Sequence, residues 1–304
     1  MNIEKSKDGT IKLNFPIAKL PTTNPPQNTT TTNPPQNFPL SKTSSPEYSA
    51  VIIPLGDKKT LCLSSQIGCA MGCSFCISGK RKFERNLSLD ELKEQLEAAR
   101  EYLNASDEAF LSDEISSIVF MGMGEPLLNL ENVLAFCDWI NKEYGYAYSR
   151  LLISTSGIIP KMREVIKRYP NKVQLALSLH SPFQEIRDKI MPGLKAYPIK
   201  ELIEVCHEYN KIYRQKIMIE YVMIDGLTDR DEDLEALIKM NFTKRTNFNL
   251  IPLNSNFELD GKIMKSSSKE RMSEFRDKLM SKGYKCFTRT SMGGDIEAAC
   301  GMLR

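Results

Sequence analysis

Apolar segments of strand length alternate with longer amphipathic segments through most of this 304-residue chain. The strand candidates cover residues 50–53, 61–65, 117–121, 151–154, 173–178, 216–223, 247–251 and 284–289. The helix candidates between them cover residues 89–102, 130–144, 159–169, 199–213, 230–240 and 269–282. A strand followed by a helix, repeated along the chain, predicts a parallel sheet with right-handed crossovers. An α/β barrel typically uses roughly 250 residues, so the sequence predicts a full or partial (β/α) barrel. A doubly wound open sheet is the alternative.

Two of the helix candidates begin with the sequence of a capping box. In this motif a serine side chain accepts from the third helical N–H while a glutamate reaches back to the serine N–H. The pattern occurs as Ser88-x-x-Glu91 and as Ser267-x-x-Glu270. We therefore expect helices to begin after Ser88 and Ser267.

The N-terminal part of the chain differs in composition from the rest. Residues 20–46 are rich in Thr, Asn, Pro and Gln, and the heptapeptide at 22–28 is repeated at 31–37. Such a segment cannot bury enough apolar surface to offset the loss of chain entropy. We predict a disordered tail over residues 1–46 and one folded domain over residues 47–304.

The overall composition is that of an ordinary globular protein, with 41% hydrophobic and 26% charged residues and a net charge of +3. No apolar stretch approaches the roughly 20 residues that a membrane-spanning helix needs. The first residues also lack the apolar core of a signal peptide. We therefore expect a cytoplasmic protein with no membrane association, and the small positive charge permits a nucleic-acid partner without requiring one.

Three cysteines, Cys69, Cys73 and Cys76, lie in one glycine-containing loop after the predicted strand 61–65. Thiolates at this spacing can ligate three irons of a 4Fe-4S cluster and leave the fourth iron open to a small molecule. A zinc site would need a fourth ligand, and His180 and His207 lie far away in the sequence. Disulfides would need an oxidising compartment. The spacing therefore predicts a cluster with an open iron.

Polar residues follow several of the other predicted strands. They are Gly122 to Pro126 with Glu125, Ser154 to Gly157, Ser178 to His180, and Asn249 to Asn254. The carboxyl ends of parallel strands meet at one edge, so these groups should surround one pocket. Taken singly, each is more often a local cap or a satisfied buried histidine. Beside a cluster they predict a site for a nucleoside that bears an amino acid, with the Glu125 carboxylate available to an ammonium group.

A series of motifs extends from about Thr60 to the C-terminus. They occupy residues 60–69, the cysteine loop, 121–129, 154–157, 178–180, 219–223 and 295–301. In this order they resemble the RlmN/Cfr family of radical S-adenosylmethionine (SAM) RNA adenine methyltransferases. The resemblance implies a radical SAM catalytic domain over residues 47–304. It also implies methylation of an adenine ring carbon, C2 favoured with C8 as the alternative, in ribosomal or transfer RNA.

The resemblance also implies roles for individual residues. Cys300 would take a methyl group from one SAM, and a second SAM would bind the cluster held by Cys69, Cys73 and Cys76. The methyl carbon would then join the adenine, and Cys62 would form a disulfide with Cys300 to release the methylated base. The implied SAM contacts are Gly124, Glu125, Ser154, Ser178, Leu179, His180 and Asn254. An electron donor such as flavodoxin or ferredoxin and a monomeric state are expected as well.

Two departures from the family pattern stand out. Family members carry a helical accessory domain ahead of the first strands, whereas the low-complexity segment occupies that place here. The family also has a glutamate base before the strand that leads to Cys62. Ungapped matching puts Ser49 there, which leaves Glu47 as the candidate base. The alternative functions are a radical SAM enzyme that acts on a protein or other substrate, and a non-catalytic iron-sulfur or zinc protein.

Overall fold

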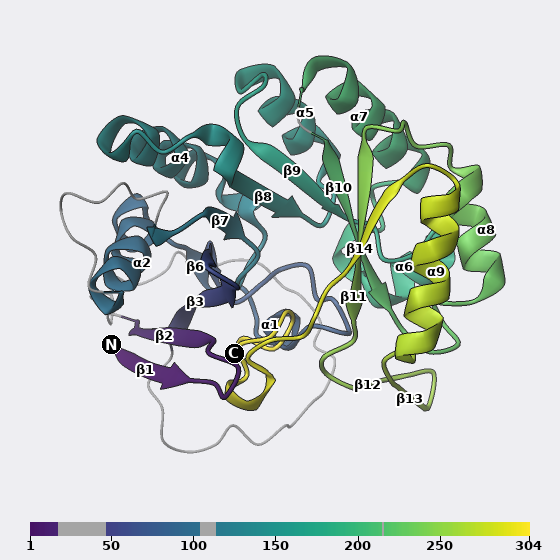
Figure 1. The fold of residues 1–304 in the computed structure, drawn as a ribbon, viewed down its shortest axis with the longest axis horizontal. Coiled ribbons are helices and arrows are strands. Elements are labelled where there is room, and N and C mark those ends of the chain that lie inside the picture. Colours follow the sequence, from purple (N-terminus) through teal and green to yellow (C-terminus); the bar gives the residue numbers. More distant parts are fainter. Residues whose placement is uncertain (18–46, 104–113, 215) are drawn as a thin grey trace, which may run out of the picture.

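The strands of the main sheet lie side by side in the order in which they occur in the sequence (Figure 1). The computed structural model describes residues 1–17, 47–103, 114–214 and 216–304. Within these residues the sheet consists of β1 (Asn2–Lys5), β2 (Ile11–Pro16), β3 (Glu47–Leu55), β4 (Lys58–Cys62), β7 (Ser117–Phe120), β8 (Leu151–Thr155), β9 (Gln174–Ser178), β10 (Ile217–Met223), β11 (Thr246–Pro252) and β14 (Lys285–Thr288). The first four strands pair antiparallel, and every pair from β4 to β14 is parallel.

The parallel part of the sheet is a partial barrel. Because its strand order never reverses, every right-handed crossover places its helix on the same face of the sheet. A doubly wound sheet would need such a reversal. Figure 1 shows the helices around the outside of the curved sheet. Among the described residues, β1 and β14 are the two edge strands and do not pair with each other, so the sheet does not close. The longer helices in the described part of the chain are α2 (Leu89–Tyr102), α4 (Leu130–Tyr144), α5 (Ile159–Arg168), α7 (Ile199–Ile212), α8 (Asp231–Lys239) and α9 (Lys269–Ser281).

Each predicted strand and helix is present, with ends that differ by a few residues at most. The first capping box is confirmed, because Ser88 Oγ accepts from Glu91 N at 3.2 Å and Glu91 Oε2 accepts from Ser88 N at 2.8 Å. The second is wrong by one residue. Ser268 caps α9 by accepting from Arg271 N at 3.1 Å, and Ser267 is buried.

The predicted tail over residues 1–46 is wrong for its first part. β1 and β2 form an antiparallel hairpin, and β2 pairs along its whole length with β3. Leu13 and Phe15 are almost fully buried, and the Phe15 ring stacks on Tyr48 at 5.2 Å between centroids. The apolar alternation Ile11, Leu13 and Phe15 is the period of a half-buried strand. The remainder of the predicted tail, residues 18–46, lies outside the described residues.

Several short elements were not predicted. They are the hairpin of β5 (Gln66–Ile67) and β6 (Arg85–Asn86), α1 (Ile77–Lys80), α6 (Gln184–Ile190), and the hairpin of β12 (Phe257–Leu259) and β13 (Lys262–Met264). Each is too short for a periodic pattern to identify it. Among the described helices, none is both long enough and apolar enough to cross a bilayer.

The two faces of the parallel strands have different surroundings. Leu61 and Ile219 belong to the large core between the sheet and the helices. Their neighbours Cys62 and Glu220 point to the opposite face and line a cavity inside the partial barrel. Successive side chains of a strand point to opposite faces. One set of strands therefore supplies both the core and the functional side chains.

The packing of the N-terminal hairpin gives a prediction about stability. Leu13→Ala should lower the free energy of unfolding by about 2–5 kcal/mol, because Leu13 is fully buried in the main core. Ile3→Ala, on the 42% exposed side chain of β1, is the matched control and should change it by less than about 0.5 kcal/mol. Urea unfolding of both variants makes the comparison. Equal effects would contradict the packing of β2 into the core.

Candidate active site

The inner face of the sheet opens into two adjoining cavities of about 510 and 170 Å³. The larger one is lined by Cys62, and the smaller one by Cys69 and Cys73. Cys76 and Cys300 line both. The fold therefore brings the cysteine loop, the end of β4 and the C-terminal segment to one continuous space.

The cysteine loop is held tightly by backbone packing. A Cβ on Gly68 would lie 1.9 Å from Lys82 O, and its φ of +72° also favours glycine. Ser74 N donates to Ile190 O at 2.9 Å, and Gly193 N donates to Met71 O at 3.0 Å. The loop conformation that presents the thiols is thus fixed by its neighbours.

The three loop thiols fit a 4Fe-4S cluster. Cys69, Cys73 and Cys76 are free and half-buried. Burial raises the pKa of Cys69 to about 12 and raises the pKa values of the other two, and the neighbouring thiols raise all three further. Positive iron would hold them as thiolates. Among the described residues no His, Cys, Asp and Glu side chains gather closely enough for a single metal ion, whereas a cubane spreads its thiolates over separate irons.

The turn after β7 lines the smaller cavity with Gly124 and Glu125. Gly124 has a φ of +102°, and a Cβ there would lie 2.5 Å from the Gln66 Cβ. The buried Glu125 carboxylate accepts from Ser156 N at 2.8 Å, from Ser156 Oγ at 2.5 Å and from Leu127 N at 3.0 Å. Burial raises its pKa, although these hydrogen bonds oppose the shift. Protein donors thus already use both oxygens of Glu125.

Ser154, Ser178 and His180 also line the smaller cavity, as the sequence predicted. His180 has a φ of +60°, and its Nδ1 accepts from Val222 N at 3.1 Å. Burial lowers the pKa of His180 to about 3, so the imidazole is neutral. Leu179 differs, because it is fully buried in the main core and lines neither cavity. Side chains alternate between the faces of the sheet, which turns Leu179 away from its two neighbours.

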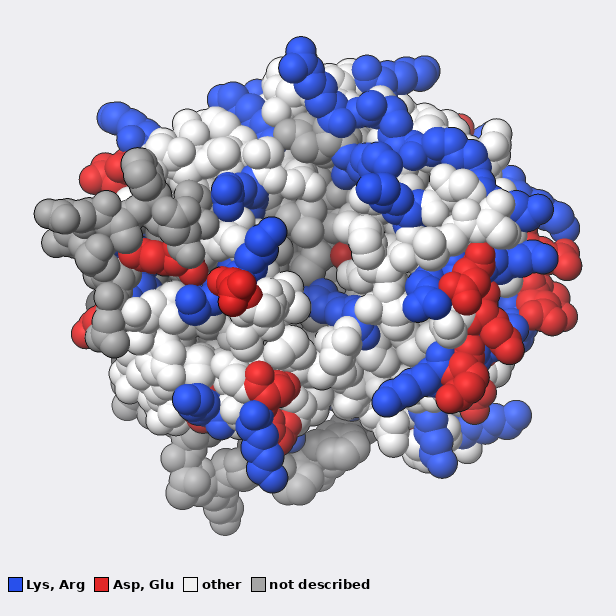
Figure 2. All heavy atoms as spheres, in the orientation of Figure 1, with Lys and Arg blue, Asp and Glu red and all other residues white. Residues whose placement is uncertain are grey.

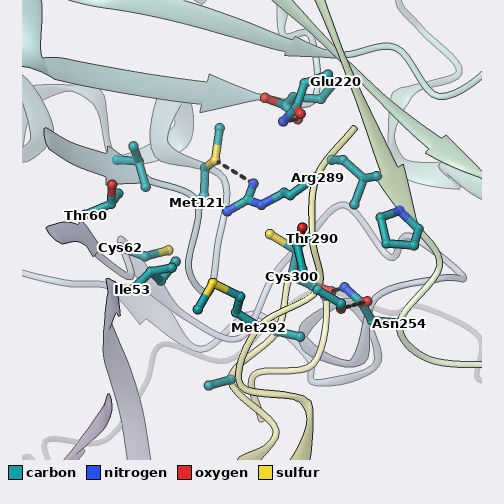
Figure 3. Close-up of a pocket in the computed structure, with 18 of the residues that line it drawn as sticks. Ile53, Thr60, Cys62, Met121, Glu220, Asn254, Arg289, Thr290, Met292 and Cys300 are labelled. Atoms are coloured by element: carbon teal, nitrogen blue, oxygen red, sulfur yellow. Dashed lines mark hydrogen bonds between the residues drawn. The ribbon is translucent and has the colours of Figure 1, made fainter. Parts of the chain in front are cut away.

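Cys62 and Cys300 face one another across the larger cavity, with their sulfur atoms turned inward (Figure 3). Both are free thiols. Burial and the nearby Cys300 raise the pKa of Cys62 to about 12, and the positive charge of Arg289 opposes the shift. The fold therefore unites the two cysteines that the family resemblance had paired.

Arg289, Glu220 and Asn249 also belong to this site. The sequence had placed Asn249 among the polar residues at the strand ends and Arg289 near Cys300 as a phosphate contact, whereas Glu220 had no predicted role. Glu220 is buried in β10, and its Oε2 accepts from Asn249 Nδ2 at 2.8 Å. Arg289 donates from Nη1 to Met121 Sδ at 3.7 Å (Figure 3). The charges of Cys300, Glu220 and Cys62 raise the pKa of Arg289. An acidic residue within an apolar parallel strand was the available signal for Glu220.

Asn254 supports the C-terminal segment. Its Nδ2 donates to Cys300 O at 2.9 Å, and its Oδ1 accepts from Ser291 Oγ. It lines both cavities. The structure thus places Asn254 beside the predicted SAM site and in direct contact with the backbone of Cys300.

Glu47 does not reach either cavity. It is the first residue of β3 and pairs with Pro16, and its backbone oxygen accepts from Arg81 Nη1 at 2.7 Å. The ladder from Glu47 to Ile52 is uninterrupted, so no local shift carries Glu47 toward Cys62. Ser49 is buried and donates to Asn14 Oδ1 at 2.7 Å. The predicted role of Glu47 as a base is therefore not supported by its position.

The face of the molecule drawn in Figures 1 and 2 carries many Lys and Arg side chains. Figure 2 shows Lys and Arg side chains over α5 and α7, whereas acidic and basic side chains are mixed over α8 and α9. The cations of α5 are Lys161, Arg163, Lys167 and Arg168. Lys161 pairs with Glu164 at 2.7 Å, Arg163 with Glu208 at 3.0 Å and Arg168 with Glu131 at 2.5 Å, so glutamates offset part of this positive charge.

Comparison with known proteins identifies relatives. The model of the radical SAM superfamily matches residues 63–239. The chain is 40% identical over 257 residues to "Dual-specificity RNA methyltransferase RlmN" from Desulfotalea psychrophila, covering 83% of this chain and 70% of that protein. It is 39% identical over 257 residues to the protein of the same name from Geotalea uraniireducens, covering 84% and 71%.

Solved structures agree with these relatives. A radical SAM methyltransferase from Sphaerobacter thermophilus superposes with a TM-score of 0.83 at 32% identity, over 100% of this chain and 80% of that one. A spore photoproduct lyase variant, with a TM-score of 0.51 and 13% identity over 75% and 76%, shares the fold alone. Radical SAM enzymes use a 4Fe-4S cluster and SAM, and RlmN consumes two SAM per turnover. The chain belongs to the RlmN/Cfr family of the radical SAM superfamily.

Proposed function

We propose that this protein methylates an adenine ring carbon of RNA through a methyl group carried by Cys300. The observation that carries the proposal is the position of Cys300, which lines the cavity of the cluster cysteines and also the cavity of Cys62. A thiol at this junction can receive a methyl group on one side and deliver it on the other. The relatives are named dual-specificity RNA methyltransferases, which supports RNA as the substrate.

The residues around the smaller cavity would bind SAM. Cys69, Cys73 and Cys76 would hold the cluster, which when bound supplies the electron for reductive cleavage of SAM. The close backbone approach at Gly124 and the neutral imidazole of His180 suit a nucleoside pocket. Of the predicted contacts, Leu179 can contribute only through its backbone, because its side chain is buried in the core.

Cys300 and Cys62 would act in sequence. The Cys300 sulfur would attack the methyl carbon of one SAM, so that a sulfur–carbon bond forms, the sulfonium–methyl bond breaks and S-adenosylhomocysteine leaves. This methyl carbon would give up one hydrogen atom, which leaves as part of 5′-deoxyadenosine, and would replace the hydrogen of the adenine ring carbon. The Cys62 thiolate would then attack the Cys300 sulfur. A disulfide would form as the bond from Cys300 to the methyl carbon breaks, and the carbon, which keeps the electron pair of that bond, would take up a proton to complete the methyl group. Arg289 favours the Cys62 thiolate, since its charge opposes the rise of the Cys62 pKa.

The substrate would be an adenine that can leave its stack. A base inside a helix cannot reach a buried thiol, so an unpaired or flipped nucleotide is required. The larger cavity, at about 510 Å³, suits a ligand of nucleotide size. The Lys and Arg side chains over α5 and α7 would contact RNA phosphates (Figure 2), and Lys161, Arg163 and Arg168 would exchange their glutamate partners for them. We favour methylation at C2, with C8 as the alternative, in ribosomal RNA, transfer RNA or both.

The second candidate is a radical SAM enzyme that modifies a protein or another substrate. It would need the cysteine loop, yet it has no use for the facing pair Cys62 and Cys300. The cytoplasmic location, the monomeric state and a flavodoxin or ferredoxin as electron donor stay predictions.

The proposal is tested with protein reconstituted anaerobically with iron and sulfide, then supplied with dithionite, SAM and RNA lacking native modification. Wild type should form methyladenosine, and mass spectrometry against standards names the carbon. Cys300→Ala should form none, because no thiol carries the methyl group. Cys73→Ala should lose iron and both products, methyladenosine and 5′-deoxyadenosine. Deoxyadenosine without methylated RNA from the wild type would point to the second candidate.

The resolving role of Cys62 gives a separate prediction. Cys62→Ala should leave RNA covalently bound to Cys300, because the thiol that would release the methylated base is missing. Electrophoresis of the denatured protein, with and without ribonuclease, measures the adduct. Cys286→Ala, which removes a buried thiol outside both cavities, is the control. Normal turnover by Cys62→Ala would exclude this role.

The influence of Arg289 on Cys62 can be measured directly. Arg289→Met should slow alkylation of Cys62 by iodoacetamide at pH 9 by about tenfold per unit of added pKa, because the thiolate becomes scarcer. Arg289→Lys keeps a positive charge and should stay near wild type. Cys286, whose pKa burial also raises to about 12, is the internal reference. Peptide mass spectrometry follows both thiols, and an unchanged Cys62 rate would contradict the electrostatic effect.

A further inference from the structure

The segment that carries Cys300 has little regular structure of its own. Between β14 and the C-terminus it contains only one short 3₁₀ turn, Gly294–Ile296. Three residues have positive φ, namely Gly293 at +70°, Glu297 at +53° and Gly301 at +78°. Its internal backbone hydrogen bonds are local ones, such as Ala298 N to Gly293 O at 2.8 Å and Met302 N to Ala299 O at 2.9 Å. They shape the turns of the segment, and contacts with other elements set where the segment lies.

The turn between β1 and β2 supplies contacts from one side. Gly293 N donates to Asp8 Oδ2 at 2.7 Å. Asp295 accepts from Ser6 Oγ at 2.5 Å and from Lys7 N at 3.2 Å. Figure 1 shows this turn lying beside the C-terminal segment. Two carboxylates, one from each end of the chain, thus join the segments reciprocally.

Backbone packing adds to these bonds. A Cβ on Gly293 would lie 2.9 Å from Thr10 Cγ2 and 2.8 Å from Ala298 Cβ. Lys12 Nζ, from β2, also donates to Ile296 O at 3.3 Å. The hairpin therefore packs closely against residues 293–298 through both backbone and side-chain contacts.

The cavity side supplies a second set of contacts. Asn254 Nδ2 donates to Cys300 O at 2.9 Å, Ile77 N to Gly301 O at 2.7 Å, and Ser78 Oγ to Leu303 O at 2.6 Å. These bonds hold the end of the segment against β11 and the cluster loop. The hairpin holds its beginning.

We propose that the β1–β2 turn, residues 6–12, is a clasp that positions Cys300 between Cys62 and the cluster cysteines. Asp8 and Asp295 are its positioning residues. Hydrogen bonds to a carboxylate are stronger than those between neutral groups. The hydrogen bonds to Asp8 lower its pKa to about 2, so the clasp is charged at every pH at which the protein would work.

The effect that we expect of the clasp on catalysis rests on the proposed function. Cys300 has to meet a methyl donor in one cavity and Cys62 in the other. A misplacement of about 1 Å can cost about 10²-fold in such a step. The clasp lies outside both cavities, so its loss should leave SAM cleavage intact and impair only the steps that use Cys300.

The first test needs no turnover. Diamide oxidises two thiols to a disulfide and itself takes up the two electrons and two protons. In the reconstituted protein, formation of the Cys62–Cys300 disulfide, followed by peptide mass spectrometry, should slow about tenfold in Asp8→Ala and Asp295→Ala, because the effective concentration of the two thiols falls. Asp8→Asn keeps an acceptor for Gly293 N–H and should retain most of the rate. Asp57→Ala, on the exposed β3–β4 turn, is the control.

The second test is the ratio of methyladenosine to 5′-deoxyadenosine. It should fall about tenfold in the two alanine variants and recover in Asp8→Asn. A lower Tm with an unchanged ratio and an unchanged disulfide rate would overturn the clasp, since stabilisation alone would then explain the contacts. A wild type that methylates no RNA would overturn the proposed function, while the disulfide rates would still decide on the clasp.

Discussion

The site depends on the parallel ladder from β4 to β14, because that ladder fixes which side chains face inward. Each strand presents alternate residues to the helices and to the inner cavity. Leu61 and Ile219 pack into the core, and Cys62 and Glu220 face the cavity. A slip of one residue in either strand would turn the functional side chain into the core and the core side chain into the cavity. The apolar residues between the sheet and the helices therefore determine the geometry of the site.

Most of the fold could be predicted because the elements are long enough to show their periods. The limits of α2 and α4 coincide with the predicted ranges. The N-terminal hairpin was missed for a compositional reason, since the Pro- and Thr-rich segment that follows it dominated the reading of residues 1–46. The alternation of Ile11, Leu13 and Phe15 gave the correct signal. The misplaced cap of α9 shows a narrower limit, because a second serine follows Ser267 and sequence alone does not choose between them.

The site was predictable only where its residues are close in sequence or match a family motif. The cysteine loop was evident from spacing, whereas Cys62 and Cys300 required the family resemblance. The sequence indicated Arg289 only as a phosphate contact near Cys300, and the fold adds its position beside both thiols and Glu220. Glu47 illustrates the opposite error. Its chemistry suited a base, but the register of β3 with β2 holds it away from the cavity.

Electrostatic interactions link the two facing cysteines, Cys62 and Cys300, to Arg289 and Glu220. Burial raises the pKa values of Cys62, Cys73 and Glu220, which disfavours their charged forms. Arg289 offers positive charge to Cys62 and Glu220, and the cluster would offer it to Cys73. Arg289 thus makes a thiolate at Cys62 less unfavourable, although burial still raises the pKa of Cys62 to about 12. Since Cys300 also interacts with Arg289, any displacement of the C-terminal segment would alter the charge balance of Cys62 as well as its distance from Cys300. The position of Cys300 and the reactivity of Cys62 are therefore coupled through Arg289.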